Sequence, residues 1–376
     1  VLYENMKAIC EQGADFIYTD ELTFQGTTKN ITVAHFKPDF AIDNLRANNY
    51  ICHFTVFQKS LLEKEGLFRS ECDGSQDFDM VLRLTEQAQK IVHIPKPLYF
   101  WRSHAQSVAS SVGAKPYVIQ AAKKAIGDHL KRVGLDGEVL DSVVPSMYRL
   151  KYEIKGEPLI SILIPNKDHV SDLRKCIVSI QEKTSYPNYE IIVIENNSEE
   201  EKTFQYYQLL EKRRNIRVVC WNGKFNYSAI NNFGYTFAKG EYILLLNNDT
   251  EVISADWLQE MLMYAQRGDV GAVGAKLYYP DNTVQHGGVV LGVGGVAAHL
   301  HCNRQKEDPG YMGRLIYAQD LTAVTAACMM LPRKVWEETG GLDESFEVAF
   351  NDVDLCMRIR QKGYLIVFTP YAELYH

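Results

Sequence analysis

Between residue 157 and the end of the chain, apolar blocks alternate with polar blocks in a regular order. The stretches PLISILIP, YEIIVIE, IRVVCW and EYILLL are largely apolar, which is typical of strands buried on both faces of a parallel sheet. The segment after the first stretch places Leu173, Cys176, Ile177 and Ile180 at the i, i+3, i+4, i+7 spacing of a helix. Because strands and helices alternate, the pattern predicts a doubly wound α/β fold with a mostly parallel sheet.

Polar residues follow these predicted strands. In chain order, the strand ends carry Pro165, Asn166 and Asp168, then Glu195 and Asn197, then Asn248, Asp249 and Glu251. The carboxyl ends of parallel strands meet at one crevice, where such sheets bind their ligands. We therefore expect one ligand site, built from strand ends that lie far apart in the sequence.

The N-terminal part of the chain repeats the later part. EKEGLFRSECDGSQDFDMVLRL at 63–84 parallels EETGGLDESFEVAFNDVDLCMRI at 337–359, and DFIYTDE parallels YILLLNNDTE. In this alignment, Asp20, Asp77 and His104 take the places of Asp249, Asp352 and His376. The expected organisation is the second half of one module over residues 1–112, a connecting helix and strand over 113–156, and a second, nearly complete module over 157–376.

Composition narrows the class of protein. The formal net charge is −7 and the Lys and Arg residues are scattered, so the chain lacks the basic surface that a nucleic-acid partner requires. The 8 cysteines stand singly, as small core residues do in a reducing, cytoplasmic compartment. Apolar runs stay shorter than the roughly 18 residues that a membrane span needs. The chain starts at Val1, inside what reads as a domain, so we expect a piece of a longer protein.

An ordered set of motifs carries a family resemblance. The motifs are ISILIPNKD, IIVIENNS, FNYSAINNFGYTFAKGEY, LLLNNDTEV, GAVGAKLYYPDNTVQHGGVVLG, AVTAACMMLPRKVWEETGGLDESF, NDVDLCMR and AELYH. Together they resemble the family-two glycosyltransferases with a nucleotide-binding GT-A fold, specifically the bacterial tandem enzymes that build rhamnose-containing surface polysaccharides. The resemblance covers residues 157–376 densely and residues 1–110 as the acceptor-side half of another module.

The resemblance implies an activity and its partners. It implies an inverting, metal-dependent transferase that moves a sugar from a UDP- or dTDP-linked donor to a saccharide or lipid-linked saccharide acceptor. The products would be O-antigen or capsule-like polysaccharides of the bacterial cell envelope. With a lipid-linked acceptor, such an enzyme would work in the cytoplasm in peripheral association with the inner face of the plasma membrane.

Transfer from such a donor needs a cation that neutralises the leaving diphosphate, and Mn²⁺ or Mg²⁺ does this with carboxylate ligands. By the resemblance, Asp249 belongs to the D-x-D metal motif, whose first position is here Asn247, and Glu251 and His376 complete the metal shell. From the residues alone, an Asx turn at the strand end remains an alternative for Asp249, and a solvent-exposed position remains one for His376.

The acceptor hydroxyl must lose a proton, which a positioned carboxylate accepts. The stretch NDVDLCMR places Asp352 and Asp354 at the start of a helix, and the resemblance makes Asp352 the catalytic base, with Asn351 where the family usually has Glu. A helix cap is the alternative for Asp352. Thr325 and Asp354 are expected on the acceptor side, although Thr325 also fits a strand of small, packed residues.

The donor side is expected at the remaining strand ends. The residues that would face the nucleotide are Pro165, Asn166, Asp168, Glu195, Asn197 and Asn248. The resembled family commonly has Asp at the place of Glu195. Asn231, read as lying at a helix start, would approach the diphosphate through the helix N-terminus.

Two further motifs match other kinds of site only in part. GVGGVA at 292–297 has the glycines of a dinucleotide-binding fingerprint but lacks the acidic residue about 20 positions further on. HLHC at 299–302, with His286 upstream, offers too few well-spaced ligands for structural zinc.

Three hypotheses of function remain at this point. The leading one is the metal-dependent glycosyltransferase. The second is a catalytically inactive, glycosyltransferase-like scaffold that binds carbohydrate or organises assembly, and Asn247 and Asn351 motivate it. The third is a glycoside hydrolase with Asp249 and Asp352 as its carboxylate pair. The first module has Leu22 at the place of Glu251 and lacks the donor strands, so we expect it to be inactive in this chain.

Overall fold

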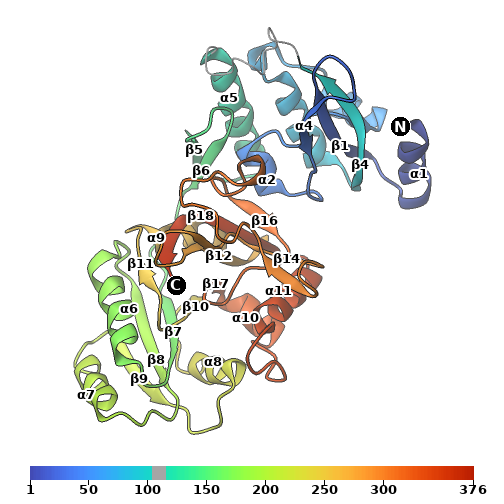
Figure 1. Cartoon of the computed structure of the whole chain (residues 1–376). Helices are drawn as coiled ribbons and strands as arrows, with labels where there is room; N and C mark the ends of the chain where they lie inside the picture. The colour runs from blue at the N-terminus through green and yellow to red at the C-terminus, as the bar shows by residue number, and fades with distance from the viewer. Residues whose placement is uncertain (104–115) are drawn as a thin grey trace. The chain divides into compact units, whose positions relative to one another are not determined.

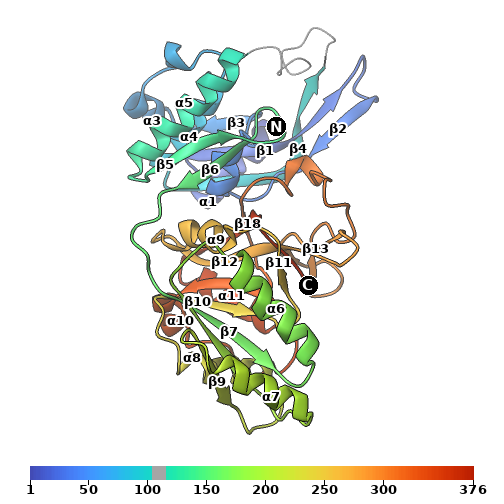
Figure 2. The same cartoon turned by 90° about the vertical axis from the view of Figure 1, so that its left-hand side faces the viewer.

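The computed structural model describes residues 1–103 and 116–376, and the chain divides into two compact units, Val1–Glu153 and Ile154–His376 (Figure 1, Figure 2). The division falls close to the module boundary that the sequence predicts at residue 157. His104 lies outside the described residues. Each unit has a main sheet of its own, and each is described by itself.

One large sheet runs through the second unit, with the strand order β11-β18-β12-β17-β10-β7-β8-β9. The four apolar runs of the sequence form adjacent parallel strands in it: β7 (Ile160–Asn166), β8 (Tyr189–Glu195), β9 (Ile216–Cys220) and β10 (Tyr242–Leu246). The inner positions of β7, β8 and β10 are almost all buried, as strands covered on both faces must be, whereas β9 lies at the edge of the sheet and is partly exposed. The predicted α/β architecture is confirmed.

The remainder of this sheet is mixed rather than parallel. β17 (Cys328–Pro332) runs antiparallel between β10 and β12 (Val270–Tyr278). Beyond it, β18 (Leu365–Tyr375) is parallel to β12, and the short β11 (Glu251–Val252) pairs with the end of β18. Because β17 is reversed, its first residues lie at the same end of the sheet as the carboxyl ends of β10 and β12.

Helices cover both faces of the sheet (Figure 2). α6 (Val170–Lys183) buries Leu173, Cys176, Ile177 and Ile180, the periodic residues that predict it. On the opposite face, the core is built from the sheet and from α8 (Tyr227–Tyr235), α10 (Arg333–Thr339) and α11 (Asn351–Gln361). The other helices are α7 (Glu201–Leu210) and α9 (Trp257–Ala265). Burial of these apolar faces is the main driving force for the packing.

Short strands extend the second unit beside β12 and β18. β13 (Val284–His286) pairs with β12, β14 (Val289–Leu291) pairs with β15 (Ala297–His299), and β16 (Gln319–Leu321) pairs with β18. The glycines of GVGGVA form the turn between β14 and β15, where Gly292, Gly294 and Gly295 have positive φ angles. The motif therefore makes a hairpin turn and opens no helix.

The first unit is built around a smaller sheet. β1 (Phe16–Phe24) pairs antiparallel with β2 (Ile31–His35) and β3 (Thr55–Phe57), and parallel with β4 (Ile91–Arg102). The helices of this part are α1 (Leu2–Gln12), α2 (Ile42–Ala47), α3 (Lys59–Glu65) and α4 (Gln76–Gln87), with a 3₁₀ turn, η1 (Ser70–Cys72), before α4.

The segment expected to connect two modules belongs to the first unit. It contains α5 (Pro116–Arg132) and a hairpin of β5 (Gly137–Asp141) and β6 (Tyr148–Tyr152). The buried His129 of α5 joins it to the rest of the unit: its Nδ1 lies 2.7 Å from Glu86 Oε1, and its Nε2 accepts a hydrogen bond of 3.1 Å from Arg46 Nε. A buried polar ring with both nitrogens bonded packs as part of a domain.

Strand pairing corrects one part of the predicted repeat. β1 pairs in parallel with β4 as β12 does with β18, and the antiparallel pair Ile17–Val56 matches the pair Val273–Met330. β1 is therefore the counterpart of β12, and Asp20 takes the place of Lys276. The predicted correspondence between Asp20 and Asp249 is wrong, because two apolar strands that both end in acidic residues look alike in sequence.

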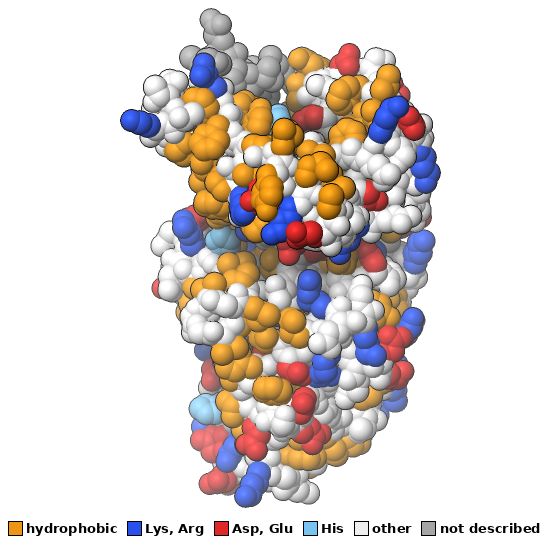
Figure 3. All heavy atoms as spheres, turned by 90° about the vertical axis from the view of Figure 1, so that its right-hand side faces the viewer, with side chains coloured by type: hydrophobic (Ala, Val, Ile, Leu, Met, Phe, Trp, Pro, Cys, Tyr) orange, Lys and Arg blue, Asp and Glu red, His pale blue; other side chains and the backbone are white. Residues whose placement is uncertain are grey.

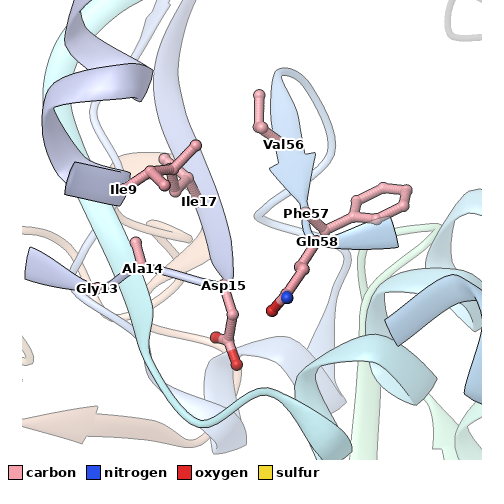
Figure 4. Close-up of a pocket in the computed structure, with 8 residues that line it drawn as sticks. All are labelled: Ile9, Gly13, Ala14, Asp15, Ile17, Val56, Phe57 and Gln58. Atoms are coloured by element: carbon pink, nitrogen blue, oxygen red, sulfur yellow. The ribbon is translucent and has the colours of Figure 1, made fainter. Parts of the chain in front are cut away.

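The first unit has no counterpart of β7–β10 within its described residues. In its sheet, β3 pairs with β1 along one edge, and its other edge has no neighbouring strand among the described residues. The corresponding strand of the second unit, β17, pairs with β10 along that edge. An apolar pocket of about 330 Å³ lies beside β3, with Ile9, Ile17 and Val56 in its wall (Figure 4). Exposed apolar side chains of α1, among them Leu2 and Tyr3, add to the apolar surface of this unit (Figure 3).

The second carboxylate of each D-x-D helix start has a structural role. In α11, Asp354 Oδ2 accepts from Arg358 Nε at 2.8 Å, and Arg358 Nη1 donates to the carbonyl oxygens of Thr339 and Gly341 at 2.7 and 2.9 Å. In α4, Asp79 and Arg83 repeat the pair at 2.9 Å, and Arg83 donates to the carbonyl groups of residues 65–67. Each Asp–Arg pair thus connects its helix to the glycine-containing turn that precedes the helix.

This arrangement yields a stability prediction. The Asp79 side chain is 0% exposed and pairs with both Arg69 and Arg83, so Asp79→Ala leaves the buried Arg83 guanidinium, which is 4% exposed, without its anion. We expect the free energy of unfolding of the first unit to fall by about 3–5 kcal/mol. Asp354→Ala should cost the second unit less, because Asp354 and Arg358 are 23% and 26% exposed.

Urea unfolding separates the two effects, because Trp101 is the tryptophan of the first unit and Trp221, Trp257 and Trp336 belong to the second. Hydrogen exchange on the same variants assigns each loss to its unit. Equal losses for Asp79→Ala and Asp354→Ala, or a loss under about 1 kcal/mol for Asp79→Ala, would contradict the burial argument.

Candidate active site

The loop after β10 brings Asp249 and His376 together. Asp249 Oδ1 lies 3.3 Å from His376 Nε2, and Asn247 Nδ2 lies 3.0 Å from the same nitrogen. The interaction with the His376 imidazole is the largest influence on the Asp249 carboxyl and lowers its pKa. The Asp249 side chain is 54% exposed, so the carboxylate faces solvent at the strand end as the sequence predicts.

Gln285 holds His376 in place. Its Oε1 lies 2.6 Å from His376 Nδ1, and its Nε2 donates to the His376 carbonyl oxygen at 3.1 Å. In addition, the backbone N–H of His376 donates to the Tyr278 carbonyl oxygen at 2.9 Å. Both the side chain and the backbone of His376 are therefore held in place. A ring that donates from Nδ1 to an amide oxygen leaves Nε2 as the nitrogen that can bind a cation, as in metal-binding histidines.

Glu251 lines a pocket together with Asp249 and His376. The pocket measures about 480 Å³ and is lined by Asp172, Lys175, Asp249, Thr250, Glu251, Pro280, Tyr375 and His376. Glu251 Oε1 lies 3.2 Å from Lys183 Nζ, which also donates to the Val252 carbonyl oxygen at 2.6 Å. Lys183 therefore balances the charge of Glu251, whereas Asp249 pairs with the His376 imidazole.

The ends of β10, β7 and β8 are joined by a chain of hydrogen bonds. Asn248 Nδ2 donates to Asn166 Oδ1 at 2.6 Å, and Asn166 Nδ2 donates to the Tyr207 hydroxyl at 2.7 Å. Tyr207 in turn donates to Glu195, which also accepts from Ser198 Oγ at 2.6 Å. The structure thus brings Asn166, Glu195 and Asn248 together, with Pro165 paired to the adjacent Ile194. Nothing in the sequence pattern singles out Tyr207.

Asp168 and Asn197 order the rim of this crevice. The Asp168 carboxylate accepts from the backbone N–H groups of Glu199 and Glu200, each at 2.9 Å, at the start of α7. Desolvation raises the pKa of Asp168, but these backbone hydrogen bonds outweigh it and lower the pKa. Asn197 donates to the Gly223 carbonyl oxygen at 2.8 Å. Both side chains bind the loops around the site.

Asn231 lies inside a helix and not at its N-terminus. α8 begins at Tyr227, and the side chain of Asn226 caps it by accepting from the Ala229 N–H at 3.0 Å. Asn231 is fully buried and donates to the Tyr227 carbonyl oxygen at 2.8 Å. The prediction that Asn231 lies at the helix start is wrong, because Asn226, a good capping residue just upstream, ends the loop earlier.

Asp352 lies at the start of α11, in contact with the segment that leads into β17. Its Oδ2 accepts from the Ala326 N–H at 3.2 Å and its Oδ1 from the Val353 N–H at 2.8 Å. Phe350, and not Asp352, is the N-cap residue, so capping does not account for this carboxylate. Thr325 lies in the segment that Asp352 contacts and accepts from the Ala327 N–H at 3.3 Å. Asp354 is held by Arg358 instead, as described above.

The first unit carries a different set of groups on β1 and its neighbours. Glu21 Oε1 lies 3.2 Å from His35 Nδ1, while Oε2 lies 3.6 Å from His53 Nδ1 and 3.8 Å from Lys37 Nζ. Desolvation raises the pKa of Glu21, but these partners outweigh it and lower the pKa to about 2. Cys52 joins Glu21 and His53 in a group with metal-ligand chemistry, yet the buried Lys37 ammonium already supplies a positive charge there.

Asp77 and Asp20 of the first unit both accept hydrogen bonds within that unit. Asp77 Oδ2 accepts from Asn49 Nδ2 at 3.2 Å, and Asp20 Oδ1 accepts from the Lys37 N–H at 2.9 Å. Asp77 lies in the first turn of α4 as Asp352 lies in that of α11, which agrees with the predicted repeat at this point.

Comparison with known proteins shows what the second unit is similar to. Residues 161–340 match the model of the family described as Glycosyl transferase family 2. This segment of the chain is therefore similar to a family 2 glycosyl transferase domain. It is 46% identical to an uncharacterized protein, y4gI, of Sinorhizobium fredii and 40% identical to the O-antigen biosynthesis protein RfbC of Myxococcus xanthus, in each case over 96% of this chain. It spans 40% and 28% of those relatives, so it covers less than half of either.

Two solved structures are also similar. A mannosyltransferase, PcManGT, of Pyrobaculum calidifontis in complex with GDP-Man and Mn²⁺ is 14% identical, with a TM-score of 0.45 over 59% of this chain and 57% of that chain. GalNAc-T7 with UDP, GalNAc and Mn²⁺ is 15% identical, with a TM-score of 0.48 over 58% of this chain and 43% of that chain. Among the residues that the structure describes, no helix has the length and apolar character needed to cross a bilayer.

The geometry around Asp249 predicts graded effects on cation binding. Asp249→Asn removes the exposed carboxylate, so we expect Mn²⁺-dependent binding of UDP or dTDP to be lost with the fold intact. Gln285→Leu leaves Asp249 and His376 in place but releases the imidazole, and such outer partners are typically worth about 10–100-fold in metal affinity.

Electron paramagnetic resonance of free Mn²⁺, titrated with protein and nucleotide, measures both variants against the parent. Circular dichroism confirms that each is folded. Binding by Asp249→Asn that equals the parent's would show that the carboxylate holds no cation.

Proposed function

We propose that the unit Ile154–His376 is an inverting, metal-dependent glycosyltransferase. It transfers a sugar, of the hexose or rhamnose class, from a UDP- or dTDP-linked donor to a hydroxyl group of a saccharide or lipid-linked saccharide acceptor. Two contacts within a segment similar to a family 2 domain carry the proposal: Asp249 lies against His376, and the Ala326 N–H holds Asp352 at the start of α11. The segment of Ala326 also touches the loop of Asp249, because the Ala327 carbonyl oxygen accepts from the Asn247 N–H.

The biological setting is proposed from the relatives. The similarity to an O-antigen biosynthesis protein supports synthesis of a bacterial surface polysaccharide, of O-antigen or capsule type. The cysteines of this chain are free, which supports a reducing compartment, and we place the enzyme in the cytoplasm at the inner face of the plasma membrane.

The residues present fit a hard divalent cation. The Asp249 carboxylate and the Nε2 of His376 would hold Mn²⁺ or Mg²⁺, and the chemistry of an oxygen and nitrogen donor pair suits these ions. When bound, the cation acts as a Lewis acid that neutralises the leaving diphosphate. Glu251, paired with Lys183, would stay at the rim of the site.

Asp352 would act as the general base. The N–H groups of Ala326 and Val353 hold its two oxygens in a fixed orientation. The acceptor hydroxyl gives its proton to this carboxylate as its oxygen attacks the anomeric carbon of the donor, and the bond to the diphosphate breaks in the same displacement. One displacement by the acceptor leaves no sugar on the enzyme, so the anomeric configuration inverts.

The two departures from the family pattern have structural explanations. Asn247 lies beside His376 through its side-chain amide, and Asn351 is buried with its Oδ1 accepting from the Asp352 N–H at 2.8 Å. An amide does both tasks without adding charge. The alternative function, an inactive scaffold that binds carbohydrate, remains the account that holds if the parent chain transfers no sugar.

The first unit is proposed to be non-catalytic in this chain. Its described residues contain no counterpart of the strands β7–β10, and Asp77 is hydrogen-bonded to Asn49. The nucleotide-facing half of a site is therefore absent from the described part of that unit.

The proposed role of Asp352 yields a kinetic prediction. Asp352→Asn should lower the transfer rate by roughly 10² to 10⁴, the usual worth of a positioned general base. Donor and Mn²⁺ affinity should stay unchanged, because Asp352 contacts the segment at Ala326 and not Asp249. Asp354→Asn is the matched control, since that carboxylate is bound to Arg358.

Transfer from UDP- and dTDP-sugars to a rhamnose glycoside measures the rate, and NMR of the product gives its anomeric configuration. An Asp352→Asn variant as fast as its parent, or a product with retained configuration, would overturn the mechanism. No transfer by the parent with any donor and acceptor would favour the scaffold.

A further inference from the structure

Two histidines lie in direct contact beside the proposed base. His286 on β13 is fully buried, while His299 on β15 is exposed. Their Nδ1 atoms are 2.8 Å apart. Two ring nitrogens at this distance need one proton between them, so one imidazole donates and the other accepts.

The backbone decides which ring donates. The N–H of Thr325 lies 3.5 Å from His286 Nε2 and points toward it, so Nε2 must be the accepting nitrogen of that ring. A neutral imidazole with an unprotonated Nε2 carries its proton on Nδ1. Complete burial keeps His286 neutral, because desolvation lowers its pKa well below the usual value. His286 therefore donates from Nδ1 to His299 Nδ1.

This contact fixes the tautomer of His299 in turn. With its Nδ1 accepting, a neutral His299 carries its proton on Nε2, and this N–H is directed away from His286. Asp352 is close enough to influence His299: desolvation lowers the pKa of His299 and the Asp352 carboxylate opposes this effect. Adjacent backbone N–H groups, of Thr325 and Ala326, thus orient the histidine pair and the carboxylate.

We propose that the Nε2–H of His299 donates a hydrogen bond to a second hydroxyl group of the acceptor sugar, beside the hydroxyl that Asp352 deprotonates. His299 is then an acceptor-binding residue that selects saccharides with a hydroxyl at that position, and His286 is a positioning residue that acts through it. A donor and an acceptor side by side match the two hydroxyl groups of a sugar ring. The inference rests on the proposed transferase function.

Kinetics of His299 variants test the role. His299→Leu should raise KM for the acceptor about tenfold, the worth of one hydrogen bond, with donor and Mn²⁺ affinity unchanged. His299→Gln should restore most of the loss, because its amide N–H can replace Nε2–H. An acceptor that lacks the second hydroxyl should react equally with the parent and with His299→Leu.

These outcomes separate the inference from the proposed function. If the parent transfers sugar and His299→Leu keeps the parent's KM for the acceptor, the assignment of His299 is wrong while the transferase stands. If the parent transfers nothing to any saccharide, the proposed function fails and this inference fails with it. A change in donor affinity equal to the change in acceptor KM would show a merely structural role.

The tautomers can be measured without any activity. Long-range ¹H–¹⁵N NMR of the imidazole rings should show His286 protonated at Nδ1 and His299 protonated at Nε2, with the variants His286→Phe and His299→Leu assigning the signals. His286 protonated at Nε2, or His299 protonated at Nδ1, would overturn the relay from Thr325 to His299.

Discussion

The backbone of residues 325–327 is the constraint on which the candidate site depends. The Ala327 carbonyl oxygen accepts from the Asn247 N–H at 3.0 Å, the Ala326 N–H holds Asp352, and the Thr325 N–H faces His286. The segment lies there because β17 runs antiparallel and so enters the sheet where β10 and β12 end. One short stretch of backbone thereby sets the spacing between the groups proposed to hold the donor and those proposed to hold the acceptor.

Small residues make this approach possible. Ala326 and Ala327 are buried at 3% and 6% exposure, so larger side chains would push the loop after β10 and the start of α11 apart. The neighbouring strand β12 is under the same steric constraint, because a Cβ on Gly274 would lie 2.5 Å from the Cβ of Val324. The Asp354–Arg358 pair then fixes α11 from its other side. In the D-x-D helix start of α11, the first carboxylate, Asp352, is thus the proposed base, and the second, Asp354, stabilises the packing of the helix.

Much of the fold could be predicted from sequence, because continuous apolar runs have few solutions other than strands covered on both faces. The proximity of Asp249 to His376 followed from the resemblance and not from the pattern. Partners that depend on a single long-range hydrogen bond, such as Gln285 for His376 and Tyr207 for Glu195, leave no periodic signal. The Asp20 correspondence failed because β1 and β10 share a pattern and differ only in their pairing partners.

The central claim is that the cation binds at Asp249 and His376, while the base, Asp352, lies at a separate end of the same site. The most direct test is a crystal of the full chain soaked with Mn²⁺ and a nucleoside diphosphate. Anomalous scattering locates the ion without reference to any assumed mechanism. The account predicts one peak within about 2.5 Å of Asp249 and His376 and none in contact with Asp352. A peak coordinated by Asp352, or an occupied site that excludes Asp249, would contradict it.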